Sequence, residues 1–299
     1  MKKYSGNLML LLCAMIWGTA FVAQSVGMDY VGPFTFQSVR YLIGALVLVP
    51  VIALRSRVKR KNPEPWPAAG DRKTPLLRGG VLCGIALCAA SCLQQVGIQY
   101  TTVGNAGFLT AMYIVIVPIL GLFLGKRIEK KAVVCVALAV LGLYLISIKS
   151  GFSMSRGDAM MCLCALLFAV QILLVDHYAP QVDGVKLACI QFLVAGLLAA
   201  VPMVLAERPS PGAVADAALP ILYTGVLSCG VAYTLQIIGQ QRAEPVVATL
   251  LMSLESVFSM AGGIILLHQV PTLREACGCL LMLLAVVLLQ LPVPARKKQ

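Results

Sequence analysis

Two ionisable side chains stand inside long apolar stretches of the sequence. Glu255 lies in the middle of LLMSLESVFS (250–259), and Arg40 lies seven residues into the apolar run that begins at Pro33. A charged side chain at the centre of a bilayer costs about 2.5–3.5 kcal/mol on insertion scales, so such residues usually face protein or a water-filled cavity. A buried carboxylate can bind a cation or carry a proton, and a buried guanidinium can bind an anion.

Each of these residues also has a structural interpretation. Glu255 can be an uncharged acid that hydrogen-bonds neighbouring backbone or hydroxyl groups. Arg40, about 10 Å from the helix end at 1.5 Å per residue, can extend its charge to the membrane surface or pair with an acid elsewhere. Both alternatives stay open. Glu255 is therefore a candidate for substrate binding and proton coupling, and Arg40 a candidate for substrate binding.

Amide side chains and one tryptophan extend this set. Amides inside lipid must find partners, so hydrogen bonding between helices is their default role. Trp17 lies about ten residues into the first apolar run, a depth that favours a cavity wall over an interfacial anchor. The apolar runs hold Gln24, Gln94, Gln95, Gln171 and Gln236. Of these, Gln95 and Gln171 join Trp17 in the predicted substrate site.

The composition places these residues in a membrane protein. The chain has 299 residues, of which 60% are hydrophobic and 12% charged, and its mean hydropathy is +0.90. Soluble domains carry about 25% charged residues, so this chain lacks the polar surface of a soluble globule. The net charge of +12 lies mainly in short segments between apolar runs. That pattern indicates membrane topology and argues against nucleic-acid binding.

Ten runs are long enough to be helices that cross the hydrocarbon core. The expected spans are Asn7–Gln24, Pro33–Leu54, Gly79–Ile98, Gly104–Leu124, Lys131–Ile148, Asp158–Val175, Gly184–Leu205, Leu219–Gln240, Pro245–Leu267 and Leu273–Leu291. With the N-terminus inside, the inner segments hold 19 of the 24 basic residues. This asymmetry predicts a multi-pass protein with both termini in the cytoplasm. The segment from Arg55 to Arg78, rich in basic residues and proline, is expected to be an irregular loop.

The two halves of the chain resemble each other. Residues 92–125 lie over 234–267 without a gap at an offset of 142, and earlier spans align at an offset of 151. Tyr113 then corresponds to Glu255, and Gln191 to Arg40, so both join the candidate substrate site. We expect two repeats, residues 1–150 and 151–299. Each holds five spans, and an odd number inverts the second copy, as in many secondary transporters.

The sequence resembles the EamA-like branch of the drug/metabolite transporter superfamily. The resemblance rests on WGTAF (17–21), RY (40–41), FLTAMYIVIVPILGLFLGKRI (108–128) and LLMSLESVFSMAGGIILLHQVPT (250–272). It implies ten helices in two five-helix repeats and small-molecule transport across the bacterial inner membrane, often export of amino acids, metabolites or drugs. It does not name the cargo.

We therefore expect a secondary transporter that works by alternating access on a small molecule, exports it and couples to protons through Glu255. A channel and an intramembrane enzyme are the alternatives, but the enzyme lacks the clustered acids, histidines or metal that such chemistry needs. The 11 cysteines lie in apolar runs without histidine or carboxylate at metal-ligand spacing, so neither metal nor cofactor is expected. Small-residue faces around Gly142 and Gly278 are compatible with a homodimer.

Overall fold

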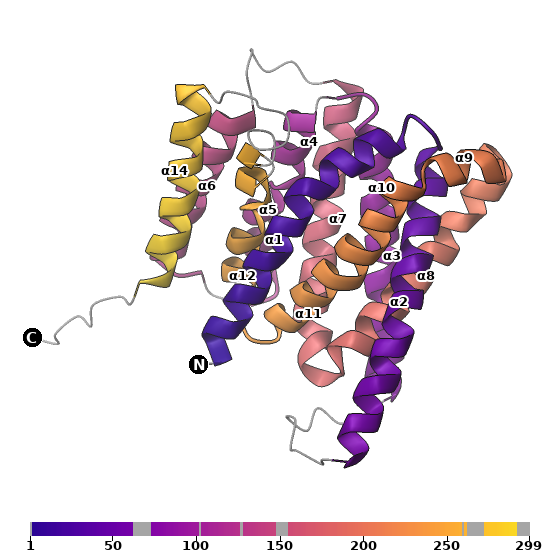
Figure 1. The fold of residues 1–299 in the computed structure, drawn as a ribbon. Helices are drawn as coiled ribbons and strands as arrows, with labels where there is room; N and C mark the ends of the chain where they lie inside the picture. Colours follow the sequence, from indigo (N-terminus) through magenta and orange to yellow (C-terminus); the bar gives the residue numbers. More distant parts are fainter. Residues whose placement is uncertain are drawn as a thin grey trace, which may run out of the picture.

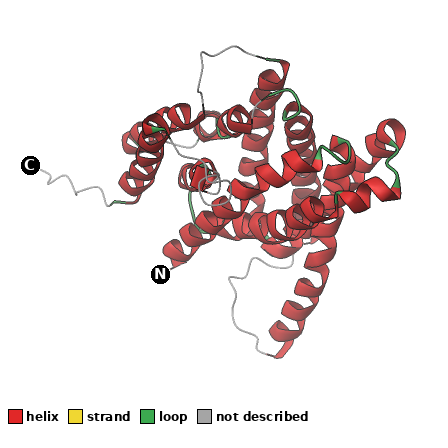
Figure 2. Cartoon of the chain, turned by 45° about the horizontal axis from the view of Figure 1, so that its top comes forward, coloured by secondary structure: helices red, strands yellow, loops and turns green. Residues whose placement is uncertain are grey.

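The computed structural model shows an all-helical chain, with no strand in the parts that it describes (Figures 1 and 2). The described residues are 2–61, 73–101, 103–125, 128–147, 155–258, 260–261 and 272–291. A helix satisfies its backbone hydrogen bonds internally, which a bilayer requires of any lipid-exposed segment. The predicted all-α class is confirmed.

The first half of the chain forms six helices. They are α1 (Lys2–Gly27), α2 (Pro33–Lys61), α3 (Lys73–Gly97), α4 (Val103–Thr110), α5 (Tyr113–Phe123) and α6 (Lys130–Ser147). The expected irregular loop between Arg55 and Arg78 is helical in both of its described parts, because α2 continues to Lys61 and α3 begins at Lys73. Its central residues, 62–72, lie outside the described residues.

The second half is wound less regularly. Its α-helices are α7 (Arg156–Tyr178), α8 (Gly184–Pro202), α9 (Pro211–Asp216), α10 (Ala218–Leu222), α11 (Thr234–Gln240), α12 (Pro245–Met252) and α14 (Leu273–Gln290). A 3₁₀ turn, η1 (Ala179–Gln181), and two π-helical segments, η2 (Met203–Glu207) and η3 (Tyr223–Tyr233), connect or extend them. The helices α7 and α14 both begin in capping boxes, at Ser155 and Thr272, which satisfy backbone N–H groups at those ends.

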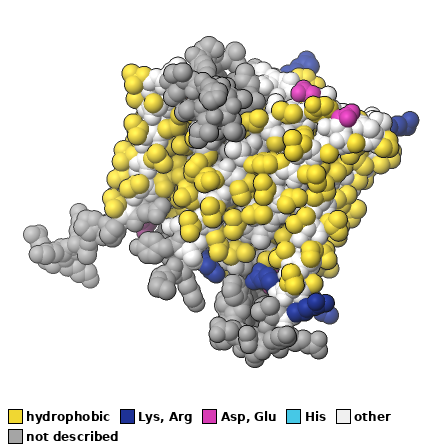
Figure 3. All heavy atoms as spheres, in the orientation of Figure 1, with side chains coloured by type: hydrophobic (Ala, Val, Ile, Leu, Met, Phe, Trp, Pro, Cys, Tyr) yellow, Lys and Arg dark blue, Asp and Glu magenta, His cyan; other side chains and the backbone are white. Residues whose placement is uncertain are grey.

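The outer surface is that of a multi-pass membrane protein. Seven stretches of the described chain are long and apolar enough to cross a membrane: Ser5–Gly27, Pro33–Arg57, Lys73–Gly97, Ala106–Phe123, Arg156–Gln181, Gly184–Glu207 and Ala218–Gln240. The helices α6 and α14 have 18 residues each, or about 27 Å at 1.5 Å per residue, close to the thickness of the hydrocarbon core. Figure 3 shows apolar side chains along the flank of the bundle, with charged side chains toward its two ends.

The fourth and ninth expected spans each contain a short turn, where the α-helical hydrogen bonding is interrupted. A turn separates α4, which ends at Thr110, from α5, which begins at Tyr113. A second turn follows Met252, the last residue of α12, and the chain is helical again from Glu255. Hydropathy records the length of an apolar run and not its hydrogen bonding, so the sequence did not predict these turns. The rest of the ninth span, beyond Ala261, lies outside the described residues.

Equivalent helices of the two halves pack against each other. The pair α6 and α14 lies at one edge of the bundle (Figures 1 and 2), and α2 packs against α8. A Cβ on Gly142 would lie 2.7 Å from the carbonyl oxygen of Gly278, and a Cβ on Gly278 would lie 2.7 Å from that of Gly142. These small faces, predicted to be available for a homodimer, instead let two backbones approach closely within the chain.

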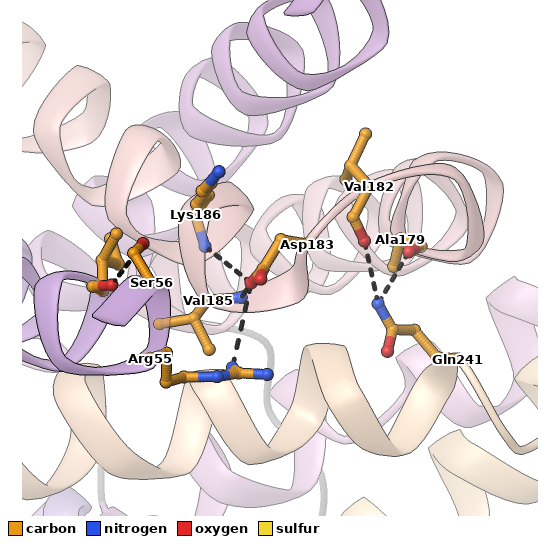
Figure 4. Close-up of polar contacts among 9 residues, drawn as sticks. Arg55, Ser56, Ala179, Val182, Asp183, Val185, Lys186 and Gln241 are labelled. Atoms are coloured by element: carbon orange, nitrogen blue, oxygen red, sulfur yellow. Dashed lines mark hydrogen bonds and ion pairs between the residues drawn. The ribbon is translucent and has the colours of Figure 1, made fainter. Parts of the chain in front are cut away.

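Polar contacts fasten α2 to the second half at both of its ends. Near its C-terminal end, Arg55 forms an ion pair of 3.8 Å with Asp183 (Figure 4), and Asp183 also caps the N-terminus of α8. At the other end, the carboxylate of Glu207 accepts hydrogen bonds from the backbone N–H groups of Phe34 and Thr35, at 2.8 and 2.6 Å. The helix α2 is therefore held against α8 and η2 along its length.

Candidate substrate cavity

A small cavity of about 40 Å³ lies between the two halves of the chain. It has room for about three water molecules, so the lining has to move apart before a small-molecule cargo fits. From the first half, α1, α2, α3 and the junction of α4 and α5 contribute Trp17, Ala20, Phe21, Gln24, Arg40, Gln94, Thr110 and Tyr113. From the second half, α7, η3, α11 and the segment after α12 contribute Phe168, Gln171, Ile172, Ser228, Tyr233, Gln236 and Glu255.

Most of this lining falls into pairs of equivalent positions. At the offset of 151, Trp17, Ala20 and Phe21 correspond to Phe168, Gln171 and Ile172; at the offset of 142, Gln94 and Tyr113 correspond to Gln236 and Glu255. Ten of the 15 lining residues belong to such pairs. The cavity is thus built by the same parts of both halves, and sequence divergence within the pairs makes its two walls chemically different.

Tyr113 and Glu255 lie immediately after the two helix breaks. The breaks occupy matched positions, Ala111–Met112 and Ser253–Leu254, 142 residues apart. Matched hydrogen bonds surround them. Ile114 N donates to Ala111 O at 3.0 Å, and its counterpart Ser256 N donates to Ser253 O at 3.3 Å. Local departures from α-helical hydrogen bonding are a recurrent way of placing polar groups in transporter sites.

The side chains of this pair meet inside the cavity. The Tyr113 hydroxyl donates to Oε1 of Glu255 at 3.4 Å, and the two side chains are 3% and 4% exposed. A hydrogen bond stabilises a buried carboxyl group, but a bond of this length is weak and one phenol leaves most of the acceptor capacity of a carboxylate unused. Glu255 can therefore accept a proton or a donor group from a ligand.

Arg40 contributes the basic group of the cavity. It is 2% exposed, so its charge does not reach the membrane surface. Its guanidinium lies over the ring of Tyr41, 4.8 Å from the centroid, and donates one hydrogen bond of 3.1 Å to the Tyr41 hydroxyl. No carboxylate of the described chain forms an ion pair with it. Both structural alternatives, a charge extended to the surface and an internal ion pair, therefore fail in the described structure.

Aromatic rings connect the Arg40 wall to the Trp17 wall. The ring of Trp17 meets that of Tyr233 edge-on at 4.7 Å, and Tyr233 meets Phe192 at 5.7 Å. Phe192 stacks on Tyr41 at 5.8 Å. Such contacts stabilise rings at centroid separations of 4.5–7 Å. They hold the large apolar walls of the cavity in fixed positions.

Several polar atoms in the lining have no hydrogen-bond partner among the described residues. They are the donor Nε1 of Trp17 and the acceptors Oε1 of Gln24, Gln171 and Gln236. Buried polar groups normally have partners, and those without one often face a site for water or a ligand. The cavity therefore offers a ligand the N–H donor of Trp17 in addition to those of Arg40. It also offers three amide oxygens as acceptors in addition to the carboxyl group of Glu255.

Five of the seven predicted site residues line this cavity: Trp17, Arg40, Tyr113, Gln171 and Glu255. Gln191 is adjacent to it, since its Oε1 accepts a hydrogen bond of 3.3 Å from Nε2 of Gln171. Gln95 is not brought there. Its Nε2 donates to the backbone of Gln24 and its Oε1 accepts from Gln37, at 3.1 and 3.2 Å, so it joins helices.

The prediction omitted several lining residues. The repeat could have identified Gln94 and Gln236, because these two positions correspond to each other. It could likewise have identified Phe168, which corresponds to Trp17. Tyr233 and Ser228 carried none. They lie in η3, where the π-helical winding departs from the ordinary helical period, and π-helical turns are frequent at functional sites. No group of three or more His, Cys, Asp or Glu side chains that could hold a metal occurs in the described regions.

A multi-pass helical protein with a cavity between two similar halves, lined by apolar side chains and a few ionisable and amide groups, has the architecture of a membrane transporter. The family model of the EamA-like transporter family matches residues 4–148 and 155–291, and the chain belongs to this family. The family is one of transporters, not of enzymes. The predicted resemblance is therefore confirmed.

Relatives with this architecture occur in archaea and bacteria. An uncharacterized transporter of Archaeoglobus fulgidus is 31% identical over 293 residues, covering 98% of this chain and 88% of that protein. An uncharacterized transporter of Clostridium kluyveri is 22% identical over 303 residues, covering 96% and 93%. A solved crystal structure with 19% identity has a TM-score of 0.78 and covers 96% of both chains; it supports the fold alone.

Proposed function

We propose that this protein is a secondary transporter that carries a small molecule across the bacterial plasma membrane by alternating access. The observation that carries the proposal is the meeting of Tyr113 and Glu255, equivalent residues placed by equivalent helix breaks, within a cavity lined by both halves. A cavity between two related halves can open to either side when the halves exchange conformations. Its cargo, by the resemblance to EamA-like carriers, is an amino acid, another metabolite or a drug.

The proposed topology has two inverted repeats, residues 1–150 and 151–299, with both termini in the cytoplasm. The distribution of basic residues supports this orientation. In Figure 1, α1 begins and α14 ends at the same end of the bundle, and α7 begins at the opposite end. That arrangement is what an odd number of crossings in the first repeat requires.

Export and proton coupling are further parts of the proposal. Export rests on the resemblance to EamA-like carriers. Proton coupling rests on Glu255, the acidic side chain of the lining. In a proton antiporter, Glu255 takes a proton from the outer side, keeps its carboxyl group neutral while the cavity is empty of cargo, and releases the proton when cargo binds from the inner side.

Counterflow in proteoliposomes tests the proposed carrier. Vesicles filled with unlabelled cargo should accumulate labelled cargo transiently above its external concentration, because a carrier exchanges one molecule for another. A channel gives no such overshoot. A flux that rises linearly with concentration and is not stimulated by cargo on the opposite side contradicts the proposal.

A further inference from the structure

Arg40 is a buried cation whose hydrogen-bonding capacity is largely unused. A guanidinium has five N–H donors and stays charged in proteins. In the described structure, Arg40 makes one hydrogen bond, to a neutral phenol, and its Nε has no partner. The residue lines the cavity and is 2% exposed. A buried charge with so few partners is costly unless another group pairs with it.

Two aromatic rings support Arg40 without neutralising it. Its guanidinium carbon lies 4.8 Å from the ring centroid of Tyr41 and 5.8 Å from that of Phe36. Cation–π contacts offset part of the cost of removing the charge from water. They engage the faces of the guanidinium, whereas its N–H donors lie in its plane. Arg40 is therefore held in place with its donors available.

Three buried or partly buried carboxylates that could serve as a counter-ion for Arg40 have other partners. Glu207 accepts hydrogen bonds from the first residues of α2, and Asp183 pairs with Arg55. Glu255 accepts from Tyr113. No described carboxylate supplies a counter-ion to Arg40, so the anion that pairs with it has to come from outside the described chain.

We propose that Arg40 binds the carboxylate of the transported molecule, and that the cargo is a zwitterion or monocarboxylic acid with an apolar body. This inference rests on the proposed transport function and selects among the cargo classes given there. It excludes a simple organic cation, because such a cargo would bind Glu255 and leave Arg40 without a partner. The planar guanidinium fork matches the two oxygens of a carboxylate. The apolar body lies against Trp17, Phe168 and Tyr233.

Charge balance favours a carboxylate over a phosphate. The lining contains one basic residue, Arg40, and one acidic residue, Glu255. A monoanion neutralises Arg40, and an ammonium group on the same cargo would pair with Glu255 and the amide oxygens of Gln171 and Gln236. A phosphate dianion would leave an excess negative charge beside Glu255 in a cavity of low polarity, which is unfavourable.

Tryptophan fluorescence of the purified protein provides the test. The chain has two tryptophans, so Trp66→Phe leaves Trp17 in the cavity wall as the reporter. The probes are matched sets: leucine with leucinamide and isopentylamine, and phenylalanine with phenylalaninamide and phenethylamine. We expect the carboxylates to bind about 10- to 100-fold more tightly than their amides, as the loss of charge-assisted hydrogen bonds predicts. Equal or tighter binding of the amides or amines, or no carboxylate binding, overturns the proposal.

Variants of Arg40 provide the second readout. Arg40→Lys keeps the charge without the fork, and Arg40→Gln places the residue found at the equivalent position 191. Both should weaken carboxylate binding and leave amide binding unchanged, a pattern that a general packing defect would not produce. Arg55→Gln, which removes the ion pair outside the cavity, should leave both unchanged. If the Arg40 variants do not fold, the ligand series on the parent protein decides alone.

Failure of this inference is distinguishable from failure of the transport function. The bound probes are then used in counterflow. If amines bind and exchange but carboxylates do neither, the protein is a carrier and the carboxylate assignment is wrong. If carboxylates bind through Arg40 but show no counterflow, the site assignment stands and the carrier mechanism is wrong.

Discussion

The hydroxyl of Tyr113 lies 3.4 Å from the Oε1 atom of Glu255, and the two residues are exactly one repeat offset of 142 positions apart. Each follows a break in its helix at the same position of its own half. A symmetric pair of tyrosines or glutamates would give a site with two identical ends. The replacement of one member by an acid gives the cavity a side that can bind a proton or a cation.

Glu255→Gln should abolish the response of transport to a pH gradient. The amide keeps the size and hydrogen-bonding capacity of the side chain but cannot exchange a proton. We expect counterflow of cargo to persist, while accumulation driven by an imposed pH gradient falls to the level seen without a gradient. Proteoliposomes with an acidic or neutral exterior provide the measurement.

Glu244→Gln is the matched control for that experiment, because Glu244 is exposed and lies just before α12 on the same segment. It should respond to the gradient as the parent does. A Glu255→Gln protein that is driven as well as the parent by the gradient shows that another group carries the proton.

Tyr113→Phe should slow transport, and the whole effect should come from the loss of the hydrogen bond to Glu255. Removal of the hydroxyl leaves the carboxyl group without its described side-chain partner, a loss of about 0.5–1.5 kcal/mol for one hydrogen bond, or a few-fold in rate or affinity. In a Glu255→Met background, where the hydroxyl has no acceptor at this position, the same change should cost less than half as much, because the effects of interacting residues are not additive. Initial rates of the two single variants and the double variant form the cycle.

The outer-facing Tyr144, which is 42% exposed, provides the comparison for Tyr113. Tyr144→Phe should leave the transport rate unchanged in both backgrounds. Fully additive effects of Tyr113→Phe and Glu255→Met would mean that the contact between these two side chains has no role in transport.

The sequence predicted the ionisable residues of the cavity better than its amides and aromatic rings. Glu255 and Arg40 stand out because charge in an apolar run is costly wherever it occurs, and the repeat then leads to Tyr113. Gln94 and Gln95 are neighbours about 100° apart on α3, and apolar surroundings do not reveal which of them faces the cavity. Only the repeat, which matches Gln94 with Gln236, separates them.

Sequence patterns could predict neither the turns within the fourth and ninth spans nor the position of Tyr233 in the cavity lining. Neither break contains glycine or proline: the residues are Ala111–Met112 and Ser253–Leu254. Their hydrogen-bond register is set by tertiary packing, which overrides local preference. Tyr233 reaches the cavity through the π-helical winding of η3, which no periodicity of 3.6 residues predicts.

Gly142→Ala should destabilise the protein although alanine is the better helix former. A Cβ at this position would lie 2.7 Å from the backbone oxygen of Gly278 and 2.9 Å from Cγ of Met282, so α6 and α14 would have to separate. Overpacking of this kind costs about 1–3 kcal/mol, more than the gain of about 1 kcal/mol from helix propensity. Thermal unfolding in detergent should show a lower midpoint than the parent.

Gly107→Ala isolates the contribution of propensity. Gly107 also lies within a helix, α4, but a Cβ there would meet no atom within 4 Å. Its midpoint should equal or exceed that of the parent. An unchanged midpoint for Gly142→Ala would mean that α6 and α14 do not approach as closely as their backbones indicate.

Labels near residue 153 and at the C-terminal tail should report opposite sides of the membrane. Both positions lie outside the described residues, so a small tag there leaves the described helices intact. In the proposed topology, five crossings precede residue 153 and ten precede the tail. An odd number of crossings lies between these two positions, so they are on opposite sides of the membrane. Accessibility of each tag to a membrane-impermeant reagent, in intact and in permeabilised cells, gives the measurement.

We expect the tag at residue 153 to react in intact cells and the C-terminal tag to react only after permeabilisation. A tag in the segment 62–72 is the control, because in this topology it follows two crossings and should behave as the tail does. If the tags at residue 153 and at the tail react together, the halves are not inverted relative to each other, and alternating access by exchange of their conformations is excluded.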